Sequence, residues 1–447
     1  MTTVNRQTAH KALNVLRRRV RWFVRPPRVP SALPPMFPGA LRMDDQEEAA
    51  VVEAVRAVVR SKKLFRFYGL SPFQPSTVRE LERAFANRLA TRHALAVNSG
   101  TSALVCALVG LGIGPGDEVI VPAYTWFSTA SAVVAVGAVP IIAEVDESLT
   151  LDPADVERKL SPYTKALIAV HMRGAPADMD RLSAFARSRN LRVVEDAAQA
   201  VGGSFRGRPL GSIGDVGAHS FQMSKIMTAG EGGMLTTSDG TVHRRAAMYH
   251  DTAVCPHLGV SLDDWLPGVN LRMSELHAAV LLVQLGRLAQ TVDDMRTRKA
   301  RLKELVGDRL RARGGRFRTI HDSRGDTSIA LIFFLPDPNS AKRVTAALAD
   351  ENVPASPLYQ DLAYLPHDHI DLHAFTAWTP ILRKRTWSAE GGPWHRHPRE
   401  VTYSADMCPA TLDLLRRAVH IDVSPELSAQ QVEQIGAAIV AVLAAHT

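Results

Sequence analysis

Short apolar segments alternate with helical segments through the first half of the chain, and this alternation constrains the fold most strongly. Each segment has the length of a strand, and the residues between them show helical apolar spacing. The segments are residues 94–97, 117–124, 138–146, 165–171 and 191–196. This order predicts an α/β fold with a mostly parallel sheet and helices on both faces. Ligands bind such sheets beyond the carboxyl ends of the strands, where residues 98–102, residues 124–126 and Asp196 fall.

The length of the chain predicts more than one domain, because 447 residues exceed one ordinary hydrophobic core. We expect a large domain over residues 41–313 and a smaller α+β domain over residues 314–447. The smaller domain should contain a strand near residues 327–335 and a helix near residues 340–350, and it should close with an amphipathic helix from Ser428.

The positive charge of the chain is concentrated before Asp44. Nine Lys and Arg residues and no acidic residue lie there, and taking nine from the 53 basic residues leaves 44 against 45 acidic ones. The basic character therefore belongs to an arm over residues 1–40 and predicts no nucleic-acid-binding face. A solvated extension, a helix on a membrane surface or an acidic partner, and an organellar transit peptide all fit this arm. The helical alternative rests on the spacing of Leu13, Leu16, Val20 and Phe23.

Apolar runs and cysteines indicate the compartment. No apolar run reaches the roughly 20 residues of a transmembrane helix, so we expect no membrane span. The three cysteines have no metal-ligand spacing. We expect them to be reduced thiols in a cytoplasmic protein.

Lys225 and Asp196 carry the clearest chemical signal. Asp196 closes a buried strand, and Lys225 follows in a Ser/Gly-rich turn with apolar neighbours. Pyridoxal phosphate (PLP) enzymes need such a pair: the lysine forms a Schiff base with the cofactor, and the carboxylate keeps the pyridine nitrogen protonated. Partial burial would lower the pKa of the lysine and make it nucleophilic. A solvated loop lysine and a helix N-cap at Asp196 are the structural alternatives.

Other residues near the strand ends suit the same cofactor but are individually weak signals. Residues 98–102 precede a helix and could bind a phosphate, although small residues there are usually a cap. Trp126 could stack on a pyridine ring or belong to the core. Gln199 could donate to the cofactor's phenolic oxygen, and Ser220 could donate to its phosphate.

Together these stretches resemble the DegT/StrS family of PLP-dependent sugar aminotransferases. The resemblance runs in family order from about residue 66 to residue 280 and returns in the tail R-R-A-V-H-I-D-V-S-P. Its main motifs are N-S-G-T-S-A-L, G-D-E-V-I-V-P-A-Y-T-W, V-E-D-A-A-Q-A, G-D-V-G-A-H-S-F-Q-M-S-K and P-G-V-N-L-R-M-S-E. It implies the aspartate-aminotransferase type of PLP-dependent transferase fold, with a mostly parallel seven-stranded sheet and a smaller C-terminal α+β domain.

The resemblance also implies a homodimer with shared active sites and a role for each matching residue. Lys225 and Asp196 are implied as catalytic, with Asp196 on the pyridine nitrogen. The implied cofactor-binding residues are Thr101, Ser102 and Ser220 at the phosphate, Trp126 on the ring, Gln199 at the phenolic oxygen, and Asn270 at the phosphate of the neighbouring subunit.

The identity of two residues bears on the reaction. Relatives with histidine at the position of Lys225 are dehydratases, so the lysine favours transamination. Gln222 after S-F resembles the aminocyclitol branch, which aminates keto-inositols with glutamine or glutamate. The expected partners are an amino acid donor and a keto-sugar or ketocyclitol acceptor. A dehydratase or other lyase on the same fold, and a PLP-fold regulatory protein with weak catalysis, remain alternatives.

Residues 357–405 contain many aromatic side chains and histidines and show little periodicity. Five of these histidines could suggest zinc, namely His367, His369, His373, His395 and His397. Without a regular element to hold ligand geometry we expect no metal, and instead a mobile substrate loop.

Overall fold

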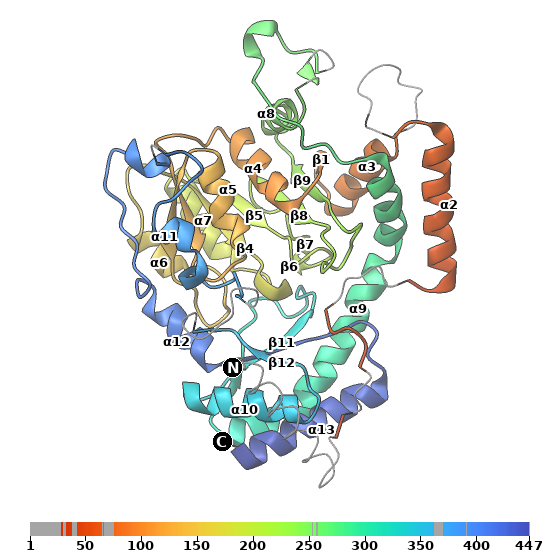
Figure 1. Cartoon of the computed structure of the whole chain (residues 1–447), viewed down its shortest axis with the longest axis vertical. Coiled ribbons are helices and arrows are strands. Elements are labelled where there is room, and N and C mark those ends of the chain that lie inside the picture. Colours follow the sequence, from red (N-terminus) through yellow and green to blue (C-terminus); the bar gives the residue numbers. More distant parts are fainter. Residues whose placement is uncertain are drawn as a thin grey trace, which may run out of the picture.

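The large domain is built on a seven-stranded sheet with the strand order β1-β9-β8-β5-β4-β2-β3 (Figure 1). The computed structural model describes residues 28–29, 33–37, 43–64, 66, 76–252, 254–255, 258–361, 370–389 and 391–446. The strands are β1 (His93–Val97), β2 (Glu118–Pro122), β3 (Val139–Ala143), β4 (Thr164–Val170), β5 (Arg192–Asp196), β8 (Val216–Ser220) and β9 (Gly233–Thr237). Neighbours from β3 to β8 pair in parallel, and β9 runs antiparallel to β1 and β8. The predicted mostly parallel sheet is therefore confirmed.

Helices cover both faces of this sheet, and so its strands are mostly apolar and buried on both faces. Every residue of β2 and β3 is buried, whereas a strand with one wet face would alternate. The helices of the large domain are α2 (Asp45–Ser61), α3 (Thr77–Leu89), α4 (Gly100–Gly110), α5 (Ser128–Ala135), α6 (Pro153–Arg158), α7 (Met179–Ser188) and α8 (Gly240–His250). None of the helices in the described part of the chain is both long enough and apolar enough to cross a bilayer.

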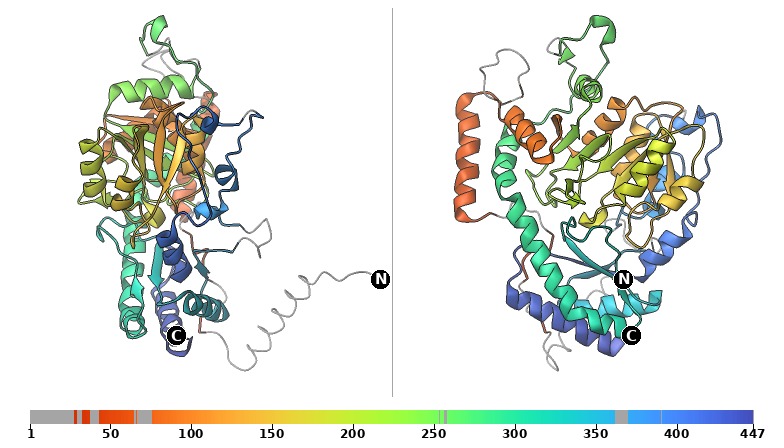
Figure 2. Two further views of the ribbon diagram at one scale, coloured as in Figure 1. Left: turned by 90° about the vertical axis from the view of Figure 1, so that its left-hand side faces the viewer. Right: turned by 180° about the vertical axis from the view of Figure 1, so that it is seen from behind.

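A long helix, α9 (Glu275–Ala312), joins the two domains (Figures 1 and 2). Its first half packs against α2 and α3, and its last turns pack against α13 (Ala429–His446). In its middle, Lys299 forms a buried ion pair with Asp326. Burial of both charges requires such a pairing.

The smaller domain is α+β, as predicted. Its sheet has the order β10-β11-β13-β12, and all pairings are antiparallel. The elements are β10 (Arg316–Phe317), β11 (Ala330–Phe334), α10 (Pro338–Asp350), β12 (Ala355–Pro357), α12 (Pro409–Arg417) and β13 (Ala418–Asp422). The closing helix α13 begins next to the predicted start, Ser428. The division into residues 41–313 and 314–447 stays a prediction.

The N-terminal segment is not entirely a detached arm. Val29 and Met36 are 0% and 9% exposed and belong to the core of the smaller domain. Arg28 forms an ion pair with Glu351 at 2.5 Å. The expectation of a separate arm over residues 1–40 is therefore wrong for residues 28–29 and 33–37, because their apolar side chains cover that core. The helix predicted from Leu13 to Phe23 lies outside the described residues.

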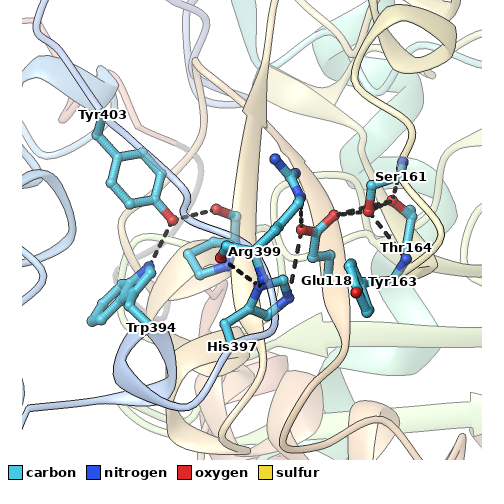
Figure 3. Close-up of polar contacts among 9 residues, drawn as sticks. Glu118, Ser161, Tyr163, Thr164, Trp394, His397, Arg399 and Tyr403 are labelled. Carbon is cyan, nitrogen blue, oxygen red and sulfur yellow. Dashed lines mark hydrogen bonds and ion pairs between the residues drawn. The ribbon is translucent and has the colours of Figure 1, made fainter.

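Residues 370–404 leave the smaller domain and lie on the large one. One end joins the strand-end loop, where Thr125 N–H donates to the carbonyl of His373 at 2.8 Å. The other end is fixed at Glu118, which accepts from Arg399 Nε and from Ser161 Oγ, each at 2.5 Å (Figure 3). We call this second attachment the Glu118 latch. It lies at the amino end of β2, away from the strand ends that face the active site.

Candidate active site

One cavity of about 330 Å³ opens at the carboxyl ends of the parallel strands. Six of the eight residues that the sequence predicts for the site line it, namely Thr101, Trp126, Asp196, Gln199, Ser220 and Lys225. They come from strand ends or the turns that follow, which parallel strands bring to one edge of a sheet. Phe37 also lines the cavity, although no site residue is predicted before residue 66.

Lys225 lies in the turn that follows β8. Phe221, Ile226 and Met227 beside it are 0%, 5% and 1% exposed. Burial lowers the pKa of Lys225 to about 8; the nearby Asp196 carboxylate opposes this shift, and Arg173 adds to it. The amine is therefore neutral in a larger fraction of molecules at neutral pH than an exposed lysine would be. A neutral amine is the form that acts as a nucleophile or a base.

Asp196 ends β5 inside the cavity and is 5% exposed. Thr129 Oγ1 donates to its Oδ2 at 2.9 Å, and Ala198 N–H donates to its Oδ1 at 3.2 Å. No helix begins after Asp196, so the alternative of a helix N-cap is wrong. Burial raises the pKa of Asp196, with Thr129 and Ala198 opposing the shift. A cation held against this carboxylate would offset its desolvation.

A narrow cradle of small residues forms one end of the cavity. Helix α4 begins at Gly100, directly after the cap residue Ser99. A Cβ added to Gly100 would lie 2.7 Å from Cβ of Ser220, so only glycine lets the first turn of α4 approach β8 this closely. Ser102 N–H donates to Ser99 Oγ at 3.1 Å, so the N–H groups of Gly100 and Thr101, together with the Ser220 hydroxyl, are the donors that suit a phosphate. Ser102, which is predicted to contact the phosphate, does not line the cavity. Its hydroxyl instead donates to Asn98 Oδ1 at 2.7 Å.

Trp126 and Gln199 occupy the cavity together with His373. Trp126 is 44% exposed and meets the His373 ring edge to face, with centroids 4.9 Å apart. Gln199 Oε1 accepts from Arg173 N–H at 2.9 Å, and its Nε2 lies 3.2 Å from His373 Nε2. His373 Nδ1 contacts Asp371, which makes Nε2 the acceptor for one hydrogen of the Gln199 amide. The second amide hydrogen remains available for a ligand oxygen.

Asn270 does not reach the cavity of its own chain. It is exposed and pairs with Asp251 at the base of the segment between α8 and α9. This segment projects beyond the large domain (Figure 1, top) and exposes Leu262, Trp265 and Val269. The predicted contact of Asn270 with a neighbouring subunit stays a prediction.

The described histidines of residues 357–405 include two that lie in different parts of the molecule. His373 lies in the cavity, whereas His397 is buried in the Glu118 latch, 3.5 Å from the Glu118 carboxylate. The expectation of a single histidine-lined substrate loop is therefore wrong for these two residues. His367 and His369 lie outside the described residues. In the described part of the chain, no group of three or more potential ligands could hold a metal.

Sequence reasoning missed Thr129 and Arg173 as site residues. The hydroxyl of Thr129 reaches Asp196 from helix α5, and only the fold shows this contact. Arg173 carries a signal in the sequence, because it is an arginine between His171 and Gly174 directly after an apolar strand. Such a residue falls at the edge where ligands bind.

The cavity suits PLP on four counts. Gly100 opens a cradle for the phosphate, and Trp126 offers a flat face to the ring. Asp196 is a buried carboxylate that forms no ion pair with a basic side chain of the described residues, which matches a protonated pyridine nitrogen. Lys225 supplies an amine with a lowered pKa for the aldehyde. The donor groups that line the cavity therefore fit this cofactor.

Comparison with known proteins gives consistent matches. The model of the DegT/DnrJ/EryC1/StrS aminotransferase family matches residues 45–370. GDP-perosamine synthase of Caulobacter vibrioides is 40% identical over 58% of the chain and 66% of its own length. The L-glutamine:2-deoxy-scyllo-inosose aminotransferase of Streptoalloteichus tenebrarius is 34% identical over 90% of the chain and 94% of its own length. The crystal structure of 3-amino-5-hydroxybenzoic acid synthase superposes with a TM-score of 0.73 at 27% identity, covering 92% of this chain and 100% of that one.

Proposed function

The chain belongs to the DegT/DnrJ/EryC1/StrS aminotransferase family, and from this premise we propose the reaction of its candidate active site. It is a PLP-dependent aminotransferase of the amino-sugar and aminocyclitol class. We propose that it moves the amino group of glutamine or glutamate to a ketocyclitol or keto-sugar. One observation carries this assignment: Lys225 and Asp196 line the same buried cavity.

Each residue of the cavity has a defined task in this proposal. Lys225 would hold the cofactor through a Schiff base, and its freed amine would then move the proton between the donor carbon and the cofactor. Asp196 would hold a proton on the pyridine nitrogen, and Thr129 would orient Asp196. When bound, PLP supplies the electron sink that makes the donor carbon acidic.

A ketocyclitol is the acceptor that the residues favour. Gln222 lines the cavity, and its Oε1 accepts from Ser224 N–H at 2.9 Å and from Ser224 Oγ at 2.7 Å. These contacts orient the Gln222 amide group beside Lys225, and the amide can bond to acceptor hydroxyls. The Streptoalloteichus relative, which the chain spans for 94% of its length, is named for glutamine and 2-deoxy-scyllo-inosose. This support leads us to propose the cyclitol and glutamine as the first pair to test.

We also propose a homodimer with shared active sites. Asn270 lies outside the cavity of its own chain, on a segment that exposes Leu262, Trp265 and Val269. A two-fold dimer would bury these apolar side chains and bring Asn270 to the partner's phosphate cradle. A cytoplasmic location is proposed because Cys106, Cys255 and Cys408 are free and buried thiols.

The deciding experiment follows the cofactor absorbance of the purified holoprotein during incubation with single amino acids. Glutamine or glutamate should convert the pyridoxal form to the pyridoxamine form, and 2-deoxy-scyllo-inosose should restore the pyridoxal form and yield the amino product. Lys225→Ala is the matched control and should do neither. Release of water or ammonia from the acceptor without a donor would instead indicate a lyase. Cofactor binding without any turnover would indicate a regulatory protein.

A further inference from the structure

Arg173 places a guanidinium in the active-site cavity, and the roles described above do not use it. It follows the end of β4 and lines the same cavity as Lys225 and Asp196. Its backbone is left-handed, with φ 52° and ψ 38°. Residues other than glycine seldom adopt this conformation, and those that do concentrate at functional sites.

The residues around Arg173 hold this loop in one arrangement. Ala177 N–H donates to His171 Nδ1 at 3.1 Å, so Nδ1 is the acceptor and Nε2 carries the proton. That proton points to the buried Glu195, whose Oε2 lies 3.0 Å away. The N–H of Arg173 itself donates to Gln199. The guanidinium is therefore presented to the cavity from a rigid base.

Among the described residues the guanidinium forms no direct ion pair, and the carboxylates of Asp422 and Asp371 act on it only from a distance. Its one hydrogen bond to a side chain runs from Nε to the hydroxyl of Tyr124 at 3.4 Å, and burial raises the pKa of that hydroxyl, so it stays neutral. No carboxylate oxygen of the described residues comes within 4.0 Å of it. The two carboxylates nearby are engaged elsewhere: Asp371 with His373, and Asp422 with His420 Nε2 at 3.1 Å.

A cation removed from water in this way needs an anion, and the planar guanidinium matches a carboxylate in particular. An amino acid donor always carries a carboxylate on the carbon that bears the reacting amine, which must come next to Lys225. Keto-sugars and ketocyclitols have no carboxylate at that position. We propose that Arg173 binds the α-carboxylate of the amino donor. This inference rests on the proposed aminotransferase function and specifies how its donor is recognised.

Arg173 should then contribute unequally to the two half-reactions. The donor gains a charged, bidentate contact with Arg173, whereas an uncharged acceptor can offer the same guanidinium only hydroxyl oxygens. One cavity can then accept two dissimilar substrates in turn. Loss of the guanidinium should consequently impair the donor half-reaction far more than the acceptor half-reaction.

The test pairs variants with matched donors. Arg173→Met removes the charge, whereas Arg173→Lys keeps the charge but loses the paired N–H donors of the guanidinium. Arg189→Met changes an exposed arginine of the same domain and serves as the control. The donors are L-glutamine and L-glutaminamide, which differ only at the α-carboxylate. For conversion of the cofactor by L-glutamine, Arg173→Met should lower the ratio of the maximal rate constant to the saturation constant about 100-fold. It should change L-glutaminamide conversion and the acceptor half-reaction by only about threefold, with Arg173→Lys in between and Arg189→Met like wild type.

Three outcomes would overturn the proposal. Equal losses with L-glutamine and L-glutaminamide would show that Arg173 does not contact the carboxylate. A loss confined to the acceptor half-reaction would assign the contact to the acceptor. Weaker PLP binding by Arg173→Met, measured by equilibrium dialysis, would make Arg173 a cofactor-binding residue.

A second measurement keeps this inference separate from the proposed function. α-Methyl-L-glutamate has no α-hydrogen and cannot be transaminated, so calorimetry measures its binding without turnover. The wild-type holoprotein should bind it about tenfold or more tightly than Arg173→Met does. If no donor is transaminated, the proposed function fails, but a difference in affinity for α-methyl-L-glutamate would still support carboxylate binding by Arg173. Equal affinities would refute the arginine's role whether or not the protein transaminates.

Discussion

The hydroxyl of Thr129 donates a hydrogen bond to Oδ2 of Asp196 at 2.9 Å, from a helix 67 residues earlier in the chain. This contact fixes the carboxylate at the end of β5, and the N–H of Ala198 fixes the second oxygen. The charge of Asp196 and the orientation of Asp196 can therefore be changed separately by mutation.

Asp196→Asn should keep one oxygen that accepts from Ala198 N–H, and its amide nitrogen can donate to the Thr129 hydroxyl, but it removes the charge that holds the pyridine proton. We expect kcat to fall by about 100- to 1000-fold, because electrostatic stabilisation of this kind acts mainly in the transition state. PLP affinity should fall much less. Steady-state kinetics and a PLP titration of the same preparation measure both effects, and near-normal turnover would mean that Asp196 is only structural.

Thr129→Val should disturb the orientation of Asp196 without removing its charge. Loss of a hydrogen bond to a carboxylate predicts a decrease in kcat of about tenfold. Thr129→Ser keeps the hydroxyl and serves as the control. If both variants have the same kcat, the hydroxyl has no role in positioning Asp196.

Lys225 should be the single site of covalent attachment of the cofactor. Borohydride reduction of the holoprotein, followed by peptide mapping, should label the peptide that contains Lys225. Lys225→Ala should retain some PLP noncovalently and lose transamination, because the Schiff base and the proton-transfer base are both gone. A label on another lysine would remove the basis of the proposed function.

Reconstitution of the cofactor-free protein should depend on pH through Lys225. Only the neutral amine attacks the aldehyde, and burial lowers the pKa of Lys225 to about 8 from 10.5. The rate should therefore rise with pH through about 8, where half of the amine is neutral, and level off at higher pH, as stopped-flow absorbance can show. Asp196→Asn removes a carboxylate that raises this pKa, so its plateau should begin at lower pH. A wild-type rate that still rises toward pH 10 would contradict the assignment.

The N-terminal segment should divide into a dispensable part and a structural part. Deletion of residues 1–27 should leave turnover and stability unchanged. Val29→Asp should lower the free energy of unfolding by about 3 kcal/mol, because it places an unpaired charge in the core of the smaller domain. Val52→Asp, at a side chain that is 47% exposed, is the matched control and should have little effect. Chemical denaturation measures all three proteins.

Shared active sites predict complementation between inactive chains. A Lys225→Ala chain and an Asn270→Ala chain should each have little activity alone. In a mixed dimer, one of the two sites would contain both wild-type residues, so mixing should restore part of the activity. No recovery, with subunit exchange confirmed by mass spectrometry, would place Asn270 outside the shared site.

The fold and the centre of the site were accessible from sequence because their signals are local. Apolar strands with helices between them predict the sheet, and Asp196 and Lys225 are close to strand ends that the pattern shows. Thr129 and Arg173 were not predicted, since their roles depend on contacts with Asp196 and Gln199 that only the tertiary structure creates.

The wrong predictions for the histidine stretch and for the N-terminal segment also arise because tertiary contacts decide where these residues lie. His373 and His397 belong to one irregular stretch, but backbone pairing at Thr125 holds one and the Glu118 latch holds the other. Residue type cannot distinguish two such attachments. Val29 lies in a Pro-rich stretch without periodicity, so nothing in the local pattern indicates that it belongs to the same core as residues of α9 and α13.

Val29 and Leu443 lie near opposite ends of the chain and belong to the same core. A ribosome releases Val29 long before Leu443, so the core of the smaller domain cannot close until Leu443 has emerged. The large domain has all its strands by Thr237 and can form while the chain is still growing. Until Leu443 emerges, the nascent protein would carry the apolar side chains of Val29 and Met36 without the core that buries them. That interval is when a chaperone would have most to bind.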